Sequence, residues 1–243
     1  MKLNIFKTPD DALTSLAVYF VVTAARSIAE SGQFSVALSG GSSPKKLYEL
    51  LASPVFKDNV EWDKVHFFFG DERNVPQTDP DSNYLMAKKA MFSPLELRSS
   101  QVFAIDTSLP PAEAAKKYTD DINNYFAGEE ARLDLVLLGL GDNSHTASLF
   151  PHTSILHEKT ASVKEVFVDE LGGVYRLSMT APLINQARCI AYLVYGDGKA
   201  SAVRHIIEGE RDIENYPAQL ISPKKGDLQW FMDTAAASKL KNN

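Results

Sequence analysis

The feature that most constrains the fold of this chain is a repeated order of apolar strand, polar loop and helix. Strand-type runs of almost wholly apolar residues lie at 34–38, 65–69 and 133–138. Helical patterns follow the first two, from Pro44 and over about 82–92. A strand that is apolar throughout has both faces buried, as happens in a parallel sheet covered by its own connecting helices. The pattern therefore predicts an α/β protein.

The remaining segments extend this α/β prediction. Thr8 is a suitable N-cap and Pro9 a suitable first-turn residue for an opening helix that continues to about Ile28. Two β-type runs joined through Gly172-Gly173 predict a small β-hairpin subdomain in the C-terminal third. We expect three layers: a mostly parallel, Rossmann-like sheet with helices on both faces. The other predicted elements are strands at 101–105, 161–168, 174–180 and 189–195, and helices at 112–126, 182–186 and 199–208.

Length and charge limit the class of protein. The 243 residues suit a single domain over 1–243, and the net charge of −6 without a long basic run disfavours a nucleic-acid partner. Cys189 is the sole cysteine, so an internal disulfide is excluded. The N-terminal residues are too polar for a signal-peptide core, and the longest apolar run, 133–138, is far below the roughly 20 residues that cross a bilayer. We expect a cytoplasmic protein without a membrane partner, monomeric or weakly dimeric.

The loops that follow the strands are where a site is expected, because ligands of open α/β sheets bind beyond the carboxyl ends of the strands. These loops come after Leu38, Phe69, Leu138 and Tyr195.

The loop after the first strand has the composition of an anion site. It reads Ser39-Gly40-Gly41-Ser42-Ser43 and leads directly into a helix, whose first N–H groups and dipole favour phosphate. It matches neither the P-loop nor the dinucleotide fingerprint, which disfavours ATP and NAD. In the structural alternative, Ser43 caps the helix and the glycines merely allow the turn.

The loop from Gly139 to Pro151 carries His145. An imidazole has an unperturbed pKa of about 6.5 and can take a proton from water near neutral pH. In the structural alternative, this histidine bonds a carbonyl and fixes the loop.

Several segments, in order along nearly the whole chain, resemble the 6-phosphogluconolactonase family. They are Ser39 to Pro44, Gly70-Asp71-Glu72-Arg73, Gly139 to Pro151, Thr180 to Asn185, Gly198-Lys199-Ala200 and Pro217 to Ile221. The family hydrolyses 6-phospho-D-glucono-1,5-lactone to 6-phosphogluconate in the oxidative pentose phosphate pathway. The resemblance implies that reaction here, on a sugar-phosphate lactone, without a cofactor and without a metal.

The resemblance also implies roles for single residues. His145 becomes the general base for water, and the phosphate loop becomes Ser39, Gly40, Gly41, Ser42 and Ser43. The cationic partners of the substrate become Arg73, Arg176 and Lys199, with Asp71 beside them in the substrate site. The structural alternatives are an ion pair of Arg73 with Asp71 or Glu72, an exposed Arg176 and a solvated Lys199.

One departure from the family lies directly before the histidine. The family usually carries Asp-Gly there, whereas this chain has Asn143-Ser144, with Asp142 one position earlier. Asn143 can orient the imidazole, and so counts as a catalytic candidate, but it cannot stabilise the protonated ring as a carboxylate would. A tolerated variant is the explanation we favour; an acid reaching in from a shifted loop, such as Asp142, and loss of catalysis stay open. Ser144 in place of glycine predicts that no left-handed backbone is needed there.

Two other functions stay open. Sugar-phosphate isomerases or deaminases of this fold place a glutamate five residues beyond the histidine, where this chain has Phe150. Without that carboxylate, Asp71 or Glu72 would have to serve as the base. The second is a non-catalytic sugar-phosphate binding protein, which the Asn143-Ser144 departure would suit.

Overall fold

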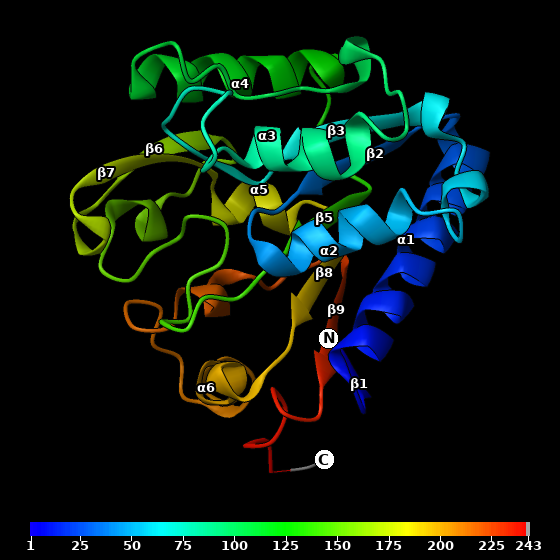
Figure 1. Ribbon diagram of the computed structural model, residues 1–243. Helices are drawn as coiled ribbons and strands as arrows, with labels where there is room; N and C mark the ends of the chain where they lie inside the picture. Colours follow the sequence, from blue (N-terminus) through cyan, green and yellow to red (C-terminus); the bar gives the residue numbers. More distant parts are fainter. Residues whose placement is uncertain (242–243) are drawn as a thin grey trace.

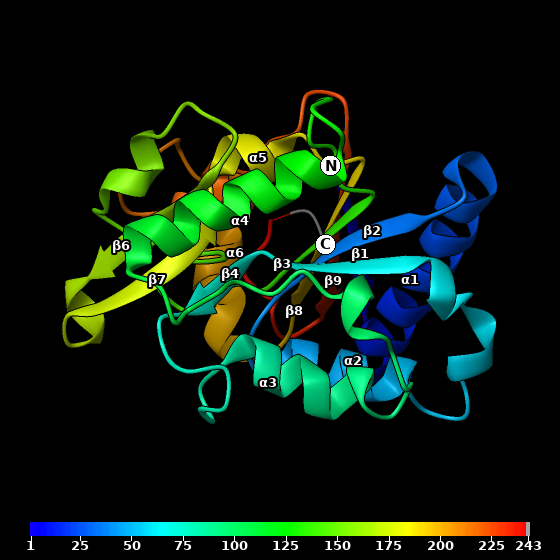
Figure 2. The same ribbon diagram turned by 90° about the horizontal axis from the view of Figure 1, so that it is seen from above.

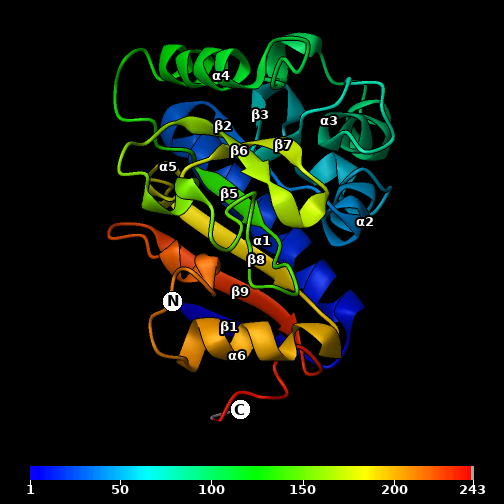
Figure 3. The same ribbon diagram turned by 90° about the vertical axis from the view of Figure 1, so that its left-hand side faces the viewer.

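The computed structural model describes residues 1–241, and its centre is a six-stranded sheet whose neighbouring strands are all parallel. The strand order is β1 (Lys2–Phe6), β9 (Asp227–Asp233), β8 (Cys189–Val194), β5 (Leu135–Leu138), β2 (Phe34–Leu38) and β3 (Val65–Phe69), as Figure 3 shows. A smaller antiparallel sheet has the order β4 (Asp71–Arg73), β7 (Val174–Met179) and β6 (Val163–Val168). The β6–β7 hairpin and α1 (Pro9–Ser31) lie on opposite sides of the molecule (Figure 1). The predicted α/β fold with a small β-hairpin is confirmed.

Helices cover both faces of the central sheet (Figure 2). One face carries α1, α2 (Ser42–Leu51) and α3 (Asn83–Ala87), which continues as a π-helical segment over Lys88–Phe92. The other carries α4 (Pro111–Tyr125), α5 (Ala181–Asn185) and α6 (Ala200–Glu208). Short 3-10 helices occupy Lys57–Asn59, Trp62–Lys64, Ser99–Gln101, Ser154–His157, Asp169–Leu171, Asp197–Lys199 and Pro217–Leu220. Val36 and Leu38 of β2 enter the core on one face of the sheet and Ala37 the core on the other face, which is why the strand is almost wholly apolar.

The first helix has the predicted ends. The N–H of Asp11 donates to Thr8 Oγ1 at 3.1 Å, and Gly32 ends the helix with a left-handed φ of 82°. By length and by its mean hydropathy of 1.5, α1 would also be able to cross a membrane. Its buried face packs into the core of the sheet, with Phe20 fully buried, as expected of a core helix in a globular fold.

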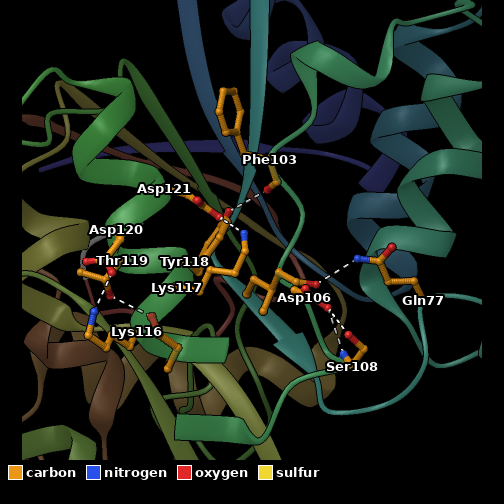
Figure 4. A network of polar contacts seen from close by, with 12 residues as sticks. Gln77, Phe103, Asp106, Ser108, Lys116, Lys117, Tyr118, Thr119, Asp120 and Asp121 are labelled. Carbon is orange, nitrogen blue, oxygen red and sulfur yellow. Dashed lines mark hydrogen bonds and ion pairs between the residues drawn. The ribbon is translucent and has the colours of Figure 1, made fainter. Parts of the chain in front are cut away.

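The prediction of a strand at 101–105 is wrong. The segment runs beside β3 and makes a single bridge to it instead of a ladder. Side chains take the carbonyl groups that a ladder would use: Tyr118 donates its hydroxyl to Phe103, and Gln77 donates its amide to Ile105, each at 3.0 Å (Figure 4). The apolar pattern identified a buried edge segment but not its hydrogen bonding.

Other differences concern the ends and edges of elements. Helix α2 begins at Ser42 rather than Pro44, and β5 begins at Leu135 rather than at residue 133. Just before β5, the Asp134 carboxylate accepts both the N–H and the hydroxyl of Ser35 at 2.8 Å. The sequence pattern does not predict β1, β4 and β9. The first and last mix polar with apolar residues, and β4 consists of three charged residues.

Candidate active site

The predicted loops meet at the carboxyl edge of the central sheet. Strands β2 and β5 are neighbours, and the chain leads from β2 toward β3 on one side and from β5 toward β8 on the other. Loops that diverge in this way leave a crevice between them. A pocket of about 260 Å³ lies there. Its lining consists of Ser39, Gly40, Gly41, Ser42, Ser43, Pro44, Asp71, Arg73, Gly139, Leu140, Gly141, His145, Thr146, Ala147, Leu193, Val194, Tyr195 and Lys199.

Most of the predicted site residues line this pocket, and two support it from outside. Asn143 contacts the His145 ring without lining the pocket. Arg176 lies on β7 directly opposite Arg73 of β4. All predicted site residues therefore belong to one region of the molecule.

The glycine loop is held by a buried tyrosine. The hydroxyl of Tyr48, on α2, accepts the N–H of Ser39 at 2.9 Å and donates to the Ser39 carbonyl at 2.8 Å. Burial raises the pKa of Tyr48, so the hydroxyl keeps the proton that it donates. A single side chain therefore satisfies both backbone groups of the residue that opens the loop.

The two glycines of this loop are required by geometry. A Cβ at Gly40 would lie 2.1 Å from Oδ1 of the buried Asn83, and Gly41 has a φ of 106°. Gly41 is the N-cap of α2, and no side-chain hydrogen bond caps the helix, so the alternative role of Ser43 as a cap is wrong. The first-turn N–H groups of α2 therefore lie beside the pocket without a capping side chain, an arrangement that suits a phosphate.

The His145 ring is fixed by its neighbours. It stacks on Phe150, with ring centroids 4.2 Å apart, and packs so closely on Gly141 that a Cβ there would lie 2.1 Å from Nδ1. Asn143 Oδ1 lies 2.5 Å from Nδ1 of the ring. An amide oxygen can only accept, so Nδ1 carries the proton and Nε2 keeps a lone pair.

The loop that carries His145 has a strained backbone. Ser144 has a φ of 66° and Ala147 a φ of 48°, so the prediction that residue 144 needs no left-handed conformation is wrong. Ser144 is held there by two backbone hydrogen bonds: its N–H donates to Gly141, and its carbonyl accepts from Ala218. Strain of this kind is concentrated at functional sites.

The imidazole is neutral at physiological pH. Burial, together with the positive charges of Lys199 and Arg176, lowers the pKa of His145 to about 4, against a smaller opposite effect of Asp142. The ring is thus ready to accept a proton without first losing one.

Positive charge accumulates beside the pocket. Arg73 donates to the Asp81 carbonyl, so its predicted structural alternative, an ion pair with Asp71 or Glu72, is not formed. Glu72 instead accepts the N–H groups of Asn83 and Tyr84 at the start of α3. Within residues 1–241, neither Arg73 nor its half-buried neighbour Arg176 has a carboxylate at ion-pair distance. Two neighbouring cations without a paired acid favour the binding of an anionic ligand.

The acids near the pocket have other partners. Asp142 accepts a charged hydrogen bond from Lys199, whose side chain is only 28% exposed, so Asp142 does not bond the imidazole and Lys199 is not simply solvated. Asp71 is buried and accepts from Ser148 Oγ at 2.7 Å; burial raises the pKa of its carboxyl group, which Ser148 and the two arginines partly counteract. In the part of the chain that the structure describes, no three His, Cys, Asp or Glu side chains are grouped to hold a metal ion.

Two residues of the site, Tyr48 and Glu170, have no distinct sequence signal, and the packing of Gly141 and Phe150 against the His145 ring does not follow from their place in the loop. Tyr48 reads as a core position of α2. Glu170 lies in the turn between β6 and β7 and accepts from Asn143 Nδ2 at 2.6 Å. A glutamate in a hairpin turn is expected to be solvated, so only the fold reveals its contact.

Comparison with known proteins agrees with this fold. The model of the family described as glucosamine-6-phosphate isomerases/6-phosphogluconolactonase matches residues 7–230. A protein of Synechocystis sp. named 6-phosphogluconolactonase is 40% identical over 220 residues, 89% of this chain and 88% of its own. One of the same name from Nostoc sp. is 37% identical over 99% of both chains. The solved structure of 6-phosphogluconolactonase from Trypanosoma cruzi has a TM-score of 0.87 at 27% identity and covers 99% of this chain and 97% of its own. The chain therefore belongs to the glucosamine-6-phosphate isomerase/6-phosphogluconolactonase family.

Proposed function

We propose that this protein is a cytoplasmic lactonase, a single domain over residues 1–243, that hydrolyses 6-phospho-D-glucono-1,5-lactone to 6-phosphogluconate in the oxidative pentose phosphate pathway. One observation carries the proposal: a neutral His145 with Nε2 available for a proton shares a pocket with a glycine loop at a helix N-terminus. The names of the relatives at 37–40% identity support the same reaction.

The chemistry needs a base and an anion site. The loop Ser39 to Ser43 binds the phosphate, and Arg73, Arg176 and Lys199 contribute positive charge. Nε2 of His145 takes a proton from water as the water oxygen attacks the lactone carbonyl carbon, which becomes tetrahedral. When the carbon–oxygen bond to the ring oxygen breaks, the same imidazole returns the proton to that oxygen. A lactone is an activated ester, so no nucleophilic side chain is required.

The site disfavours the isomerase or deaminase reaction. Phe150 occupies the position at which those enzymes are expected to carry glutamate, and its ring stacks on His145. Asp71 is an acid in the pocket, but Ser148 binds its carboxylate. The isomerase or deaminase reaction abstracts a carbon-bound proton and opens a ring. The pocket therefore lacks the second carboxylate, the glutamate expected at position 150, that this reaction would use besides Asp71.

A turnover assay tests the proposal. Freshly prepared 6-phosphogluconolactone is supplied to the wild type, spontaneous hydrolysis is subtracted, and ammonia release from glucosamine 6-phosphate is measured in parallel. We expect catalysed hydrolysis and no ammonia. Binding of 6-phosphogluconate without turnover would support the binding-protein alternative, and ammonia release would support the deaminase alternative.

Tyr48→Phe is expected to weaken substrate binding. The change leaves both backbone groups of Ser39 without their partner in a buried place, which costs about 1.4 kcal/mol, or about tenfold in KM, with kcat little changed. Steady-state kinetics measures both constants. Tyr125→Phe removes a hydroxyl that contacts His66, away from the pocket, and is the matched control. A Tyr48→Phe enzyme with wild-type KM would show that the loop does not depend on this anchor.

The protonation of His145 is expected to occur at unusually low pH. Burial and the neighbouring cations lower its pKa to about 4, so the base form predominates above that pH and is lost only as the pH falls through it. NMR titration of the imidazole in the free enzyme measures this directly. In Lys199→Gln the midpoint should move upward, because the first of the lowering charges is removed. A wild-type midpoint near 6.5 would contradict the buried, cation-flanked site.

A further inference from the structure

We propose that Glu170 is a positioning residue that acts on His145 through Asn143, in a chain of carboxylate, amide and imidazole. The inference rests on the proposed function, since it concerns the base of that reaction. It assigns to the β6–β7 hairpin a part in the active site, and it explains how an asparagine can stand where the family usually carries aspartate.

The contacts that carry the proposal join two distant segments. Asn143 Nδ2 donates to Glu170 Oε1 at 2.6 Å, across 27 residues of sequence, while Asn143 Oδ1 lies 2.5 Å from Nδ1 of His145. Glu170 belongs to the 3-10 turn Asp169–Leu171, which is closed by the left-handed Gly172. The antiparallel ladder of β6 and β7 fixes that turn in place.

The carboxylate determines which way the amide of Asn143 faces. An ionised carboxylate only accepts hydrogen bonds, so Glu170 requires the NH₂ group on its side and leaves the oxygen for the imidazole. In the reverse orientation, the Asn143 oxygen would face the Glu170 carboxylate, and both of these groups only accept hydrogen bonds. The amide NH₂ of Asn143 would then face Nδ1 of His145. The backbone N–H of His145 donates to the same Asn143 oxygen at 3.3 Å, which agrees with this orientation.

The orientation of the amide in turn fixes the tautomer of the base. With an oxygen at Nδ1, the ring carries its proton there, and Nε2 holds the lone pair that water activation needs. An aspartate would accept from Nδ1 with either oxygen, but an asparagine has one suitable end and needs a second group to select it. The other charged groups around the ring are Asp142, paired with Lys199, and the arginines Arg73 and Arg176. Glu170 is thus the acid bonded to the amide.

Both Asn143 and Glu170 are exposed, so their hydrogen bond contributes little to the stability of the fold. Variants at position 170 should therefore fold as the wild type does, and a change in the imidazole would report positioning rather than unfolding.

The first experiment compares Glu170→Ala, Glu170→Gln and Asp169→Ala. Asp169 is an exposed acid in the same turn and serves as the matched control. The readouts are the His145 tautomer, from ¹⁵N NMR shifts of the imidazole, and kcat and KM on the lactone. We expect Glu170→Ala to lose the Nδ1–H preference and about tenfold in kcat with KM unchanged. Glu170→Gln keeps both, because its amide oxygen can still accept from Asn143. An unchanged tautomer and kcat in Glu170→Ala overturns the proposal.

The second experiment changes Asn143, the middle residue of the three hydrogen-bonded groups. Asn143→Asp would bring a second carboxylate against Glu170, and like charges at that distance repel. We expect Asn143→Asp to be less active than Asn143→Asp combined with Glu170→Gln. Equal activity of the two variants overturns the proposal.

The two readouts separate this inference from the proposed function. If the wild type fails to hydrolyse the lactone while Glu170→Ala still changes the tautomer, the proposed function fails and the chain of contacts stands. If the wild type is active and Glu170→Ala matches it in both readouts, the proposed function stands and the inference fails.

Discussion

His145→Ala is expected to lower kcat for 6-phosphogluconolactone hydrolysis by about 10²- to 10⁴-fold, the usual contribution of a positioned general base. The expectation follows from the neutral imidazole, its protonated Nδ1 and its place in the lining of the pocket. KM should change little, since we propose that the glycine loop and the cations, not the imidazole, bind the phosphate. Stopped-flow proton release, corrected for spontaneous hydrolysis, measures the loss.

The matched control is His157→Ala, an exposed histidine that pairs with Glu214 outside the pocket. It should hydrolyse the lactone at the wild-type rate. Wild-type kcat in His145→Ala would remove the imidazole from its proposed role and leave the water without an assigned base.

Gly141→Ala is expected to cost about 100-fold in kcat without removing any catalytic group. The new Cβ would lie 2.1 Å from Nδ1 and 2.2 Å from Cε1 of His145, so the ring has to move. Phe150, stacked on the ring, limits where it can go. A displacement of about 1 Å in a reacting group can lower the rate by about two orders of magnitude.

Gly198→Ala provides the comparison, because a Cβ at that glycine meets no atom within 4 Å. Its kcat should match the wild type. The NMR signal of His145 should shift in Gly141→Ala and stay in place in Gly198→Ala. Full activity in Gly141→Ala would mean that the close packing of the ring on residue 141 is unimportant for catalysis.

The fold could be predicted where one physical requirement dominates the local sequence. Strands such as 34–38 and 65–69 are almost wholly apolar because both faces of each strand lie in the core, and this pattern identified them to the residue. The capped start of α1 at Thr8 is equally local. By contrast, β1 and β9 mix polar and apolar residues, and their pairing with each other depends on the two ends of the chain meeting in the sheet.

The site could be predicted as far as its loops and less well in its contacts. The glycine loop and His145 were identifiable because the carboxyl ends of parallel strands share one edge. The left-handed Ser144 was not, since backbone hydrogen bonds to Gly141 and Ala218 hold a serine in a conformation that glycine would adopt more easily. The contact of Asn143 with Glu170 depends on the position of a distant hairpin.

These contacts bear directly on the departure from the usual Asp-Gly pair. Asn143 orients the imidazole by one hydrogen bond, while Asp142 is occupied by Lys199. The favoured explanation, a tolerated variant, is consistent with this arrangement, because orientation is supplied without a carboxylate on the ring.

We propose that one pocket holds both the phosphate, at the glycine loop, and the reacting carbonyl carbon, at His145. A crystal structure with 6-phosphogluconate bound tests it most directly. We predict phosphate oxygens on the backbone N–H groups of the loop Ser39 to Ser43, and a carboxylate oxygen of the product within hydrogen-bond distance of His145 Nε2. Phosphate bound elsewhere, or a product carboxylate directed away from the imidazole, would rule out this placement of the substrate.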